Sequence, residues 1–218
     1  MAPPDAGPQQ RKSAETRVTI LKAAIDCLAR VGYARTTTQL IAKVAKMSRG
    51  AMLHHYSTKQ ELIESVTDYA FLRHLEQFIA AVRELPEVER TRDNIGILID
   101  WRLYQSAEYS AYLELTVAAR TDAELRAMFV LKAQRHDRVW REELERVFPE
   151  WAGDPERLSR SRRLVQTVMS GMVLNREIWD DPAMERALLA FLAATLLKIR
   201  DGELDWPEWD EVGLSPAA

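Results

Sequence analysis

TTTQLIAKVAKMSRGAMLHHYSTK, residues 36–59, is the stretch that decides the fold. Two short segments with apolar residues at helical spacing stand on either side of a connection of about three residues. Ser48 is a good N-cap for the second segment, and Thr37 or Thr38 serves the first. So short a turn makes the two helices cross steeply, which leaves the second helix free to enter a DNA major groove. The stretch therefore predicts a helix-turn-helix motif at about residues 37–56.

The second segment carries the residue types that a groove-facing helix needs, because small side chains allow close approach while donors reach base edges and phosphates. The candidate DNA-binding residues are Thr37, Thr38, Ser48, Arg49, Gly50, Ala51, His54, His55, Tyr56 and Lys59. Arg49 is expected at a base edge. Phosphate contacts are expected from Thr37, Ser48, Tyr56 and Lys59. The two adjacent histidines alone are more typical of an ordinary surface pair.

The same block resembles the DNA-binding domain of the TetR/AcrR family of bacterial regulators, whose pattern runs roughly T-T-x-x-x-I-A-x-x-A-x-x-S-x-G-x-L-Y-x-H-F-x-x-K. The matching positions are Ile41, Ala42, Ala45, Ser48, Gly50, His55, Tyr56 and Lys59. Met52 and Leu53 stand where the family usually has Leu-Tyr, and that tyrosine often touches a phosphate. Leu53 therefore removes one contact that the resemblance implies, and His54 or Tyr56 is the expected substitute.

Charge is unevenly distributed along the chain, although the net charge of the 218 residues is only −3. Residues 1–60 hold ten Lys/Arg against three Asp/Glu, a balance of +7, and the remainder holds 20 against 30, a balance of −10. A basic module joined to an acidic body favours phosphate binding at one face. The sequence predicts a DNA-binding domain at residues 13–57 and an effector-binding and dimerisation domain at residues 58–210, between a disordered tail (1–12) and a second tail (211–218).

Helical periodicity continues through the chain, without a strand pattern or an internal repeat. Gly32 is a stop signal for the first helix, and capping boxes are expected at Thr58–Glu61 and Thr121–Glu124. The expected helices outside the motif span about residues 13–31, 58–84, 93–105, 110–119, 121–148, 156–179 and 182–200. The sequence therefore predicts an all-α fold of about nine helices. The resemblance implies three of them for DNA and six for effector binding and dimerisation.

The helix expected at residues 156–179 is apolar nearly all round between Leu164 and Val173, so one face must pack on the core and another on a further partner. Ser170 and Gly171 are small enough for a second helix to approach closely. The resemblance implies a four-helix dimer interface made by the last two helices. The candidate interface residues are Leu164, Val168, Gly171, Met172, Asn175, Ala187, Phe191 and Ala194. A homodimer would bind a palindromic operator; the alternative is a central helix of a monomer.

Polar side chains interrupt the apolar faces of two helices in the body. His136 and Glu143 fall within the face that Phe129 and Trp140 help to define, and Arg102 falls among apolar residues of its own helix. Buried polar groups need partners. One interpretation is an effector cavity, lined by these five residues, for a small, mostly apolar molecule with one polar or anionic end. The other is internal pairing, for example of Arg102 with Glu143.

The sequence offers no set of residues for catalysis, and no cofactor or metal is expected. Four histidines, two of them in the motif, and the single cysteine Cys27 leave no ligand spacing, nucleophile–base set or Gly-rich phosphate loop. An enzyme is therefore the least favoured class. A DNA-binding regulator without a small effector, controlled by a protein partner, remains an alternative. With no signal peptide or long apolar segment, we expect no membrane contact and a cytoplasmic transcriptional regulator, most often a repressor in this family.

Overall fold

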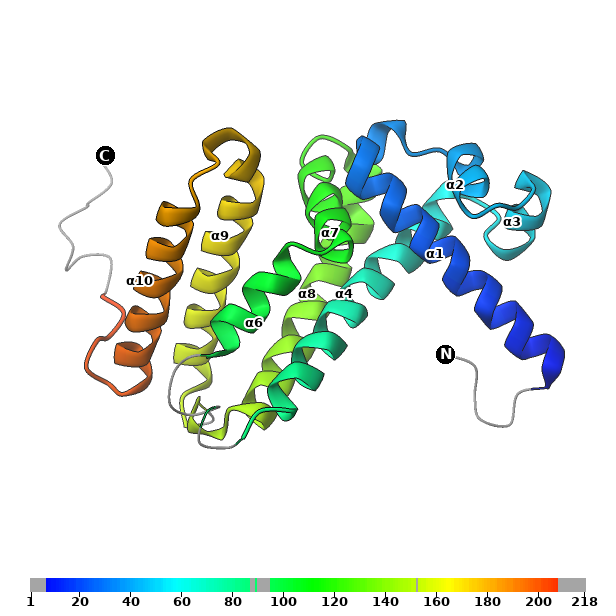
Figure 1. Ribbon diagram of the computed structural model, residues 1–218. Helices are drawn as coiled ribbons and strands as arrows, with labels where there is room; N and C mark the ends of the chain where they lie inside the picture. The colour runs from blue at the N-terminus through cyan, green and yellow to red at the C-terminus, as the bar shows by residue number, and fades with distance from the viewer. Residues whose placement is uncertain (1–6, 87–88, 90–94, 152, 208–218) are drawn as a thin grey trace. The chain divides into compact units, whose positions relative to one another are not determined.

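The computed structural model describes residues 7–86, 89, 95–151 and 153–207 (Figure 1). The helices are α1 (Pro8–Arg35), α2 (Thr38–Val44), α3 (Arg49–His55), α4 (Lys59–Arg83), α6 (Ile95–Tyr104), α7 (Ala107–Ala118), α8 (Ala123–Val147), α9 (Pro155–Trp179) and α10 (Pro182–Arg200), with a 3-10 turn at Pro149–Trp151. Over the described residues there is no strand, and the predicted all-α class is confirmed.

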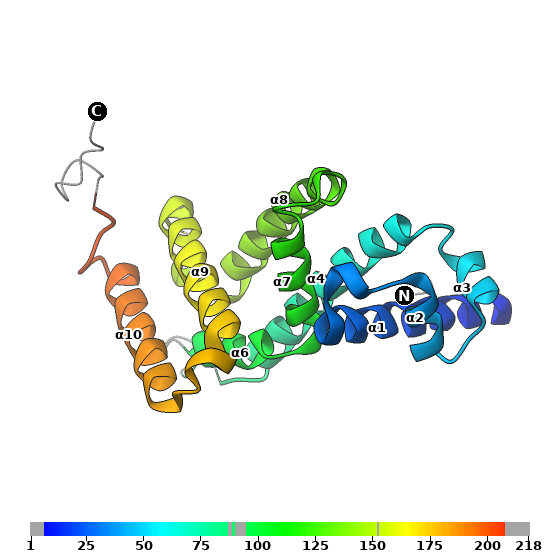
Figure 2. The same ribbon diagram turned by 90° about the horizontal axis from the view of Figure 1, so that it is seen from above.

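The chain divides into two compact units, each made from two separate stretches of sequence. Unit 1 comprises residues 1–77 and 105–138, and unit 2 comprises residues 78–104 and 139–218. This division differs from the predicted boundary after residue 57. The reason is that α7, most of α4 and most of α8 belong to the same compact unit as the three predicted DNA-binding helices, with α1 packed against α7 (Figures 1 and 2).

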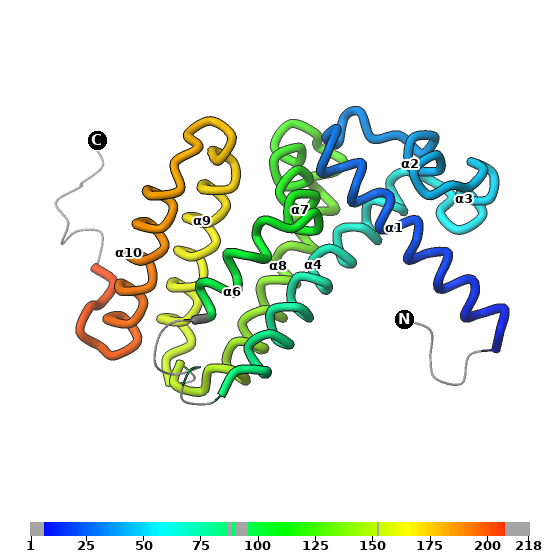
Figure 3. Tube along the Cα trace, viewed as in Figure 1, coloured from blue at the N-terminus to red at the C-terminus, as the bar shows by residue number. Residues whose placement is uncertain are grey.

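The first helix begins earlier in the chain than predicted (Figure 3). It begins at Pro8, where a proline suits the first turn because its missing N–H would be unpaired there in any case. Residues 8–12 are therefore helical and not part of a disordered tail. Residues 1–6 and the predicted tail at 211–218 lie outside the described residues.

Gly32 was predicted to stop the first helix, and it interrupts α1 with φ 79° and ψ 168°. Only glycine adopts such a backbone easily. The freed N–H of Tyr33 donates to Glu114 Oε1 of α7 over 2.6 Å, and a Cβ at Gly32 would lie 3.0 Å from that same oxygen. The break thus lets a carboxylate of α7 bind the backbone next to the helix-turn-helix. The missing side chain at Gly32 makes this approach possible.

Unit 1 is built around one apolar core to which its helices contribute their buried faces. Ile20, Ala24 and Leu28 of α1 recur at helical spacing and are fully or almost fully buried, and Leu115 of α7 is buried among them. Met52 supplies the one buried side chain of α3. Because α3 contributes only this residue to the fully buried core, most of its surface remains available to solvent.

The connection between α2 and α3 is a hydrogen-bonded helix end. The N–H of Lys46 donates to the carbonyl of Lys43 over 3.1 Å, and the N–H of Met47 donates to that of Ala42 over 3.0 Å. This pair of bonds is a Schellman motif, which requires a left-handed residue after the helix and usually has glycine there. Lys46 takes that place with φ 56°. The turn therefore carries backbone strain that glycine would not have.

Side-chain caps begin several helices, and the structure corrects one predicted cap. Thr58 Oγ1 accepts from the N–H of Glu61 over 3.0 Å, and Glu61 accepts from the N–H of Ser57 over 2.8 Å. The first capping box is thus present, with its return bond displaced by one residue to Ser57. At α8 the cap is Asp122, which accepts from the N–H of Leu125 over 2.9 Å, and not Thr121 as predicted.

Unit 2 contains α6, α9 and α10, with α9 and α10 side by side in both views (Figures 1 and 2). One carboxylate joins all three helices. Glu185 of α10 accepts from the indole N–H of Trp101 in α6 over 2.9 Å and pairs with Arg176 of α9 over 3.5 Å. Buried leucines of α10, including Leu189, Leu192 and Leu196, form its inner face.

Replacing Lys46 by glycine is expected to raise the free energy of unfolding by about 0.5–1 kcal/mol, because glycine adopts the left-handed conformation without the Cβ clash. Urea denaturation measures the change. Lys46→Ala is the matched control, since it removes the same charge but keeps the Cβ and should give no such gain. Equal stability of the glycine and alanine variants would contradict the strain argument.

Candidate DNA-binding and effector sites

Helix α3 presents a polar, small-residue surface to solvent while Met52 holds it to the core. Arg49, Gly50, Ala51 and His54 are all exposed. A Cβ added at Gly50 would meet no heavy atom of the described residues within 4 Å, so none of them covers that side of the helix. Four of the five predicted DNA-binding residues on this short helix are therefore exposed, and its shape suits close approach to a groove.

Two of the predicted phosphate contacts also form the helix caps that the sequence suggested. Thr37 Oγ1 accepts from the N–H of Leu40, and Ser48 Oγ accepts from the N–H of Ala51, each over 3.1 Å. Both residues are exposed, whereas Thr38 is half-buried. The choice left open between Thr37 and Thr38 as the cap of α2 is thus decided for Thr37.

Tyr56 and Lys59, two other predicted phosphate contacts, are placed differently. Tyr56 is only 4% exposed and packs in the unit 1 core, so its ring cannot reach a phosphate in this conformation. The ammonium of Lys59 donates to the carbonyl of Tyr33 over 3.1 Å and lies 4.1 Å from the centre of its ring. Burial lowers the pKa of Lys59. These contacts hold the end of α3 and the start of α4 against the rest of unit 1, a role that sequence spacing alone does not reveal.

The structure adds two exposed cations that the sequence analysis did not select. Lys43 on α2 and Lys46 in the turn are both exposed. The sequence did contain a signal for a role of both lysines in phosphate binding, because they lie in a basic segment next to α3. His55, by contrast, is half-buried, and burial, together with the neighbouring His54 and Arg17, lowers its pKa. It is therefore mostly uncharged near neutral pH and suits hydrogen bonding better than charge pairing.

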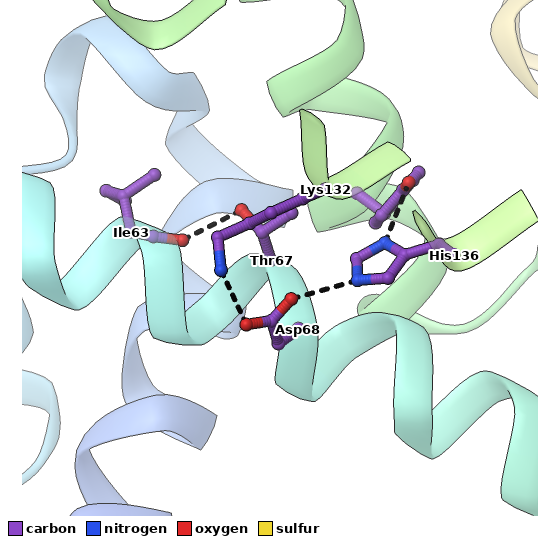
Figure 4. A network of polar contacts seen from close by, with 6 residues as sticks. Ile63, Thr67, Asp68, Lys132 and His136 are labelled. Carbon is purple, nitrogen blue, oxygen red and sulfur yellow. Dashed lines mark hydrogen bonds and ion pairs between the residues drawn. The ribbon is translucent and has the colours of Figure 1, made fainter. Parts of the chain in front are cut away.

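A polar network in unit 1 accounts for His136, one of the predicted effector contacts (Figure 4). Asp68 of α4 accepts from Lys132 Nζ over 2.6 Å and faces His136 Nε2 over 2.9 Å. On the other side of the ring, His136 Nδ1 lies 3.2 Å from the hydroxyl of Tyr112 in α7. The imidazole also stacks on Phe71, with ring centres 4.0 Å apart. The network therefore joins α4, α7 and α8 through side chains alone.

The protonation states in this network follow from burial and from the two hydrogen bonds. His136 is 5% exposed, and burial lowers its pKa more than the bond to Asp68 raises it. A neutral ring that donates from Nε2 to Asp68 and accepts at Nδ1 from Tyr112 satisfies every group. For Asp68, burial raises the pKa, but the hydrogen bonds from Lys132 and His136 outweigh it and keep the carboxylate ionised.

Unit 2 contains a cavity of about 100 Å³. Four aromatic residues line it, together with aliphatic side chains and a few polar groups. The aromatic residues are Phe78, Trp140, Phe148 and Trp151, and the polar ones are Asp100, Glu150, Ser161 and Arg162. An apolar space with a small number of polar groups is the usual form of a small-molecule site.

Of the five predicted effector residues, only Trp140 lies among the residues that line this cavity. Arg102 is exposed, so the prediction that it is buried in the apolar face of its helix is wrong. Glu143 pairs with Arg146 and not with Arg102. Phe129 is buried in the unit 1 core, and His136 lies in the network described above. The helical wheel placed these residues on inner faces correctly in three cases, but it did not identify what each face packs against.

The predicted dimer residues lie on α9 and α10, and they divide by exposure. Met172 is buried within the protomer, which removes it from a surface that a partner contacts. Leu164, Val168, Gly171 and Asn175 are half-buried, and Ala187, Phe191 and Ala194 are exposed. The same two helices expose further large apolar side chains, namely Leu174, Ile178, Trp179 and Met184. Phe191 and Ile178 are 73% and 74% exposed, which is unusual for apolar residues without a partner.

Comparison with known proteins gives concordant results. Residues 20–66 match the family model described as bacterial regulatory proteins, tetR family. An uncharacterised HTH-type transcriptional regulator of Mycobacterium tuberculosis is 29% identical over 86% of this chain and 96% of its own length. The repressor AcnR of Corynebacterium jeikeium is 33% identical over 40% of this chain and 49% of its own.

The fold has counterparts among solved structures as well. A TetR transcription regulator from Haloarcula marismortui superposes with a TM-score of 0.61, at 22% identity, over 87% of this chain and 98% of that one. These proteins are transcriptional regulators, which favours the regulatory interpretation over the enzymatic one. Among the helices that the structure describes, none is long and apolar enough to cross a membrane.

The buried histidine gives a prediction about pH. Its pKa is lowered in the folded protein from the ordinary 6.5, so the unfolded chain binds the proton more readily and stability is lost as the pH falls below that value. His136→Gln removes this titration. At pH 7 the variant should be less stable by about 1–3 kcal/mol, because Asp68 and Tyr112 lose a partner.

Urea denaturation of both proteins from about pH 7 to about pH 5 measures the effect. The parent should lose stability more steeply than His136→Gln over this interval. Parallel curves would show that the ring does not titrate as its burial requires.

Proposed function

We propose that this chain, which belongs to the TetR family of bacterial transcriptional regulators, is a cytoplasmic homodimeric repressor that leaves a palindromic operator when a small molecule fills the unit 2 cavity. The observation that carries the proposal is the exposed face of α3, held to the core by Met52. The helix lies within the first 60 residues of the chain, which carry a charge balance of +7. A protruding basic helix is suited to a negatively charged groove.

In this proposal α3 enters the major groove of double-stranded DNA. Arg49 reaches a base edge, since a guanidinium bonds bidentately to guanine. Gly50 and Ala51 allow the backbone to come close, and His54 and His55 offer hydrogen bonds. Exposed hydroxyls and cations flank the helix and are assigned to phosphates, namely Thr37, Ser48, Lys43 and Lys46, with Thr38 beside them.

A homodimer is supported by the apolar surface of α9 and α10. Exposed side chains recur on α10 at Met184, Ala187, Phe191 and Ala194, a spacing of three to four residues that places them on one helical face. On α9, a Cβ added at Gly171 would meet no described residue within 4 Å. Such open space beside exposed apolar residues suits close packing of a second copy in a four-helix arrangement.

The effector part of the proposal rests on the cavity and on the helices that line it. Phe78 of α4 and Trp140 of α8 line the cavity, while Asp68 of α4 and His136 of α8 belong to the unit 1 network. A ligand that displaces Phe78 or Trp140 therefore acts on two helices that continue into the unit holding α3. A small shift of these helices in each protomer changes the separation of the two recognition helices on DNA.

Arg49→Ala tests the DNA contacts. We expect a loss of about 1–3 kcal/mol in binding to the preferred sequence and a relaxed sequence preference, as removal of a bidentate base contact gives. Lys43→Ala is the control for phosphate binding. It should weaken binding to all sequences alike and lower the slope of affinity against salt by about 1. A reversed outcome, with sequence preference changed by Lys43→Ala alone, would contradict the assignment.

Gly171→Glu tests the dimer. The added side chain has open space in the protomer but would put an unpaired charge into the interface, so the variant should sediment as a monomer and bind the operator weakly. Gly153→Glu is the matched control, because an added Cβ there also meets nothing within 4 Å. A parent that sediments as a monomer at micromolar concentration, or a Gly171→Glu variant that stays dimeric, would contradict the proposed interface.

A further inference from the structure

The unit 2 cavity has walls suited to a flat aromatic ligand. The ring centres of Phe78 and Trp140 are 5.4 Å apart, and those of Phe78 and Phe148 are 6.4 Å apart. Gly96 permits this packing, because a Cβ there would lie 3.2 Å from Phe148 Cζ. Aromatic rings pack favourably against other aromatic rings in offset or edge-to-face arrangements. A planar ring would therefore find contacts on several sides of the cavity.

The volume of the cavity limits the ligand to a small one. It measures about 100 Å³. For comparison, an engineered protein cavity of roughly 150 Å³ binds benzene. A single aromatic ring with a small substituent fits this scale after modest adjustment of the lining side chains.

Ser161 gives the cavity a hydrogen-bonding group that none of the described residues pairs with. The side chain is 3% exposed, and its Oγ has no hydrogen-bond partner among the described residues. Elsewhere on α9, Thr167 donates to the carbonyl of Arg163 over 2.8 Å, and Ser170 donates to that of Gln166 over 2.6 Å. Ser161 makes no such bond to its own helix. A buried hydroxyl without a partner costs free energy, which a ligand oxygen in the cavity would recover.

The charged groups at the cavity favour an uncharged ligand. Asp100 is buried and Arg162 is half-buried, and both line the space. The guanidinium of Arg162 lies 5.6 Å from the centre of the Trp140 ring. Glu150 also lines the cavity, so a ligand of either sign would meet both attractive and repulsive charges, and it would also lose its hydration. A neutral molecule avoids both costs.

Building on the proposed function, we infer that the effector is an uncharged molecule of one aromatic ring that carries a hydroxyl or carbonyl oxygen, and that this oxygen bonds to Ser161. The hydroxyl of serine both donates and accepts, so it serves either oxygen. Ser161 thereby sets the polar specificity of a site whose other contacts are mainly aromatic and aliphatic.

Toluene and three para-substituted toluenes of similar shape test the inference by calorimetry with the full-length protein. The substituted compounds are p-cresol, p-toluate and 4-methylbenzylammonium. We expect p-cresol to bind at least tenfold more tightly than either charged compound. Ser161→Ala should weaken p-cresol by about 3- to 10-fold, the usual worth of one neutral hydrogen bond, and leave toluene unchanged. Thr167→Ala, which removes an exposed hydroxyl of the same helix, should change neither affinity.

The melting temperature of the ligand-free protein provides a second measurement. Ser161→Ala should keep or raise it, because the substitution removes an unpaired buried hydroxyl. A lowered melting temperature, equal loss of toluene and p-cresol affinity, tighter binding of a charged compound, or no binding of any of the four would overturn the inference.

Operator retention, measured in parallel, separates this inference from the proposed function. If p-cresol binds through Ser161 but leaves DNA binding unchanged, the inferred ligand class of the cavity stands and the effector part of the proposed function fails. If a charged compound binds more tightly and releases DNA, the cavity is an effector site but the inferred ligand class is wrong.

Discussion

The carboxylate of Asp68 is the centre of the polar contacts that join three helices of unit 1. It binds Lys132 and His136 of α8, and His136 extends the connection to Tyr112 of α7. Because α4 follows α3 in the chain after a short connection at residues 56–58, any displacement of α4 within unit 1 bears directly on the recognition helix. Apolar packing alone tolerates sliding of helices, whereas three directional polar bonds fix their register.

The helix-turn-helix combines a firmly held inner face with an outer face that makes few contacts. Met52 and Tyr56 are buried, while Arg49 and His54 are exposed on the same short helix. A helix of seven residues is unstable alone, so these anchors, together with the cap Ser48, provide the stability of α3. The exposed residues contribute little to the packing of the helix and are available to bind DNA. On α9 and α10 the exposed surface is instead apolar, with large side chains such as Phe191 in solvent, and this supports the proposed dimer.

Local signals in the sequence predicted the local structure well. The all-α class, the bounds of α10 and the caps at Thr37 and Ser48 depend on residues close together in the chain, and spacing reveals them. The burial of Tyr56 and the bond from Lys59 to the carbonyl of Tyr33 were not predicted, because the residues that they contact lie on other helices. His136 is the clearest case. Its inward position follows from periodicity, but Asp68 is 68 residues away, and no pattern links the two.

The cavity residues show the same limit. Ser161 and Asp100 looked unremarkable in the sequence, since neither belongs to a motif, and they line the same cavity only because α6 and α9 pack together. Arg102 was selected because it stands among apolar residues, yet it is exposed. The helical wheel failed for α6 because the face that it placed inward is not fully covered. Leu98 on that face is exposed, as Arg102 is.

Selection of bound duplexes from a random DNA pool, with the full-length protein, tests the central claim most directly. The account predicts enrichment of inverted repeats whose half-site centres lie about one helical turn apart, ~34–36 Å, because two copies of α3 related by a two-fold axis must enter successive major grooves. Enrichment of a single unrepeated half-site, or of no sequence at all, would contradict it.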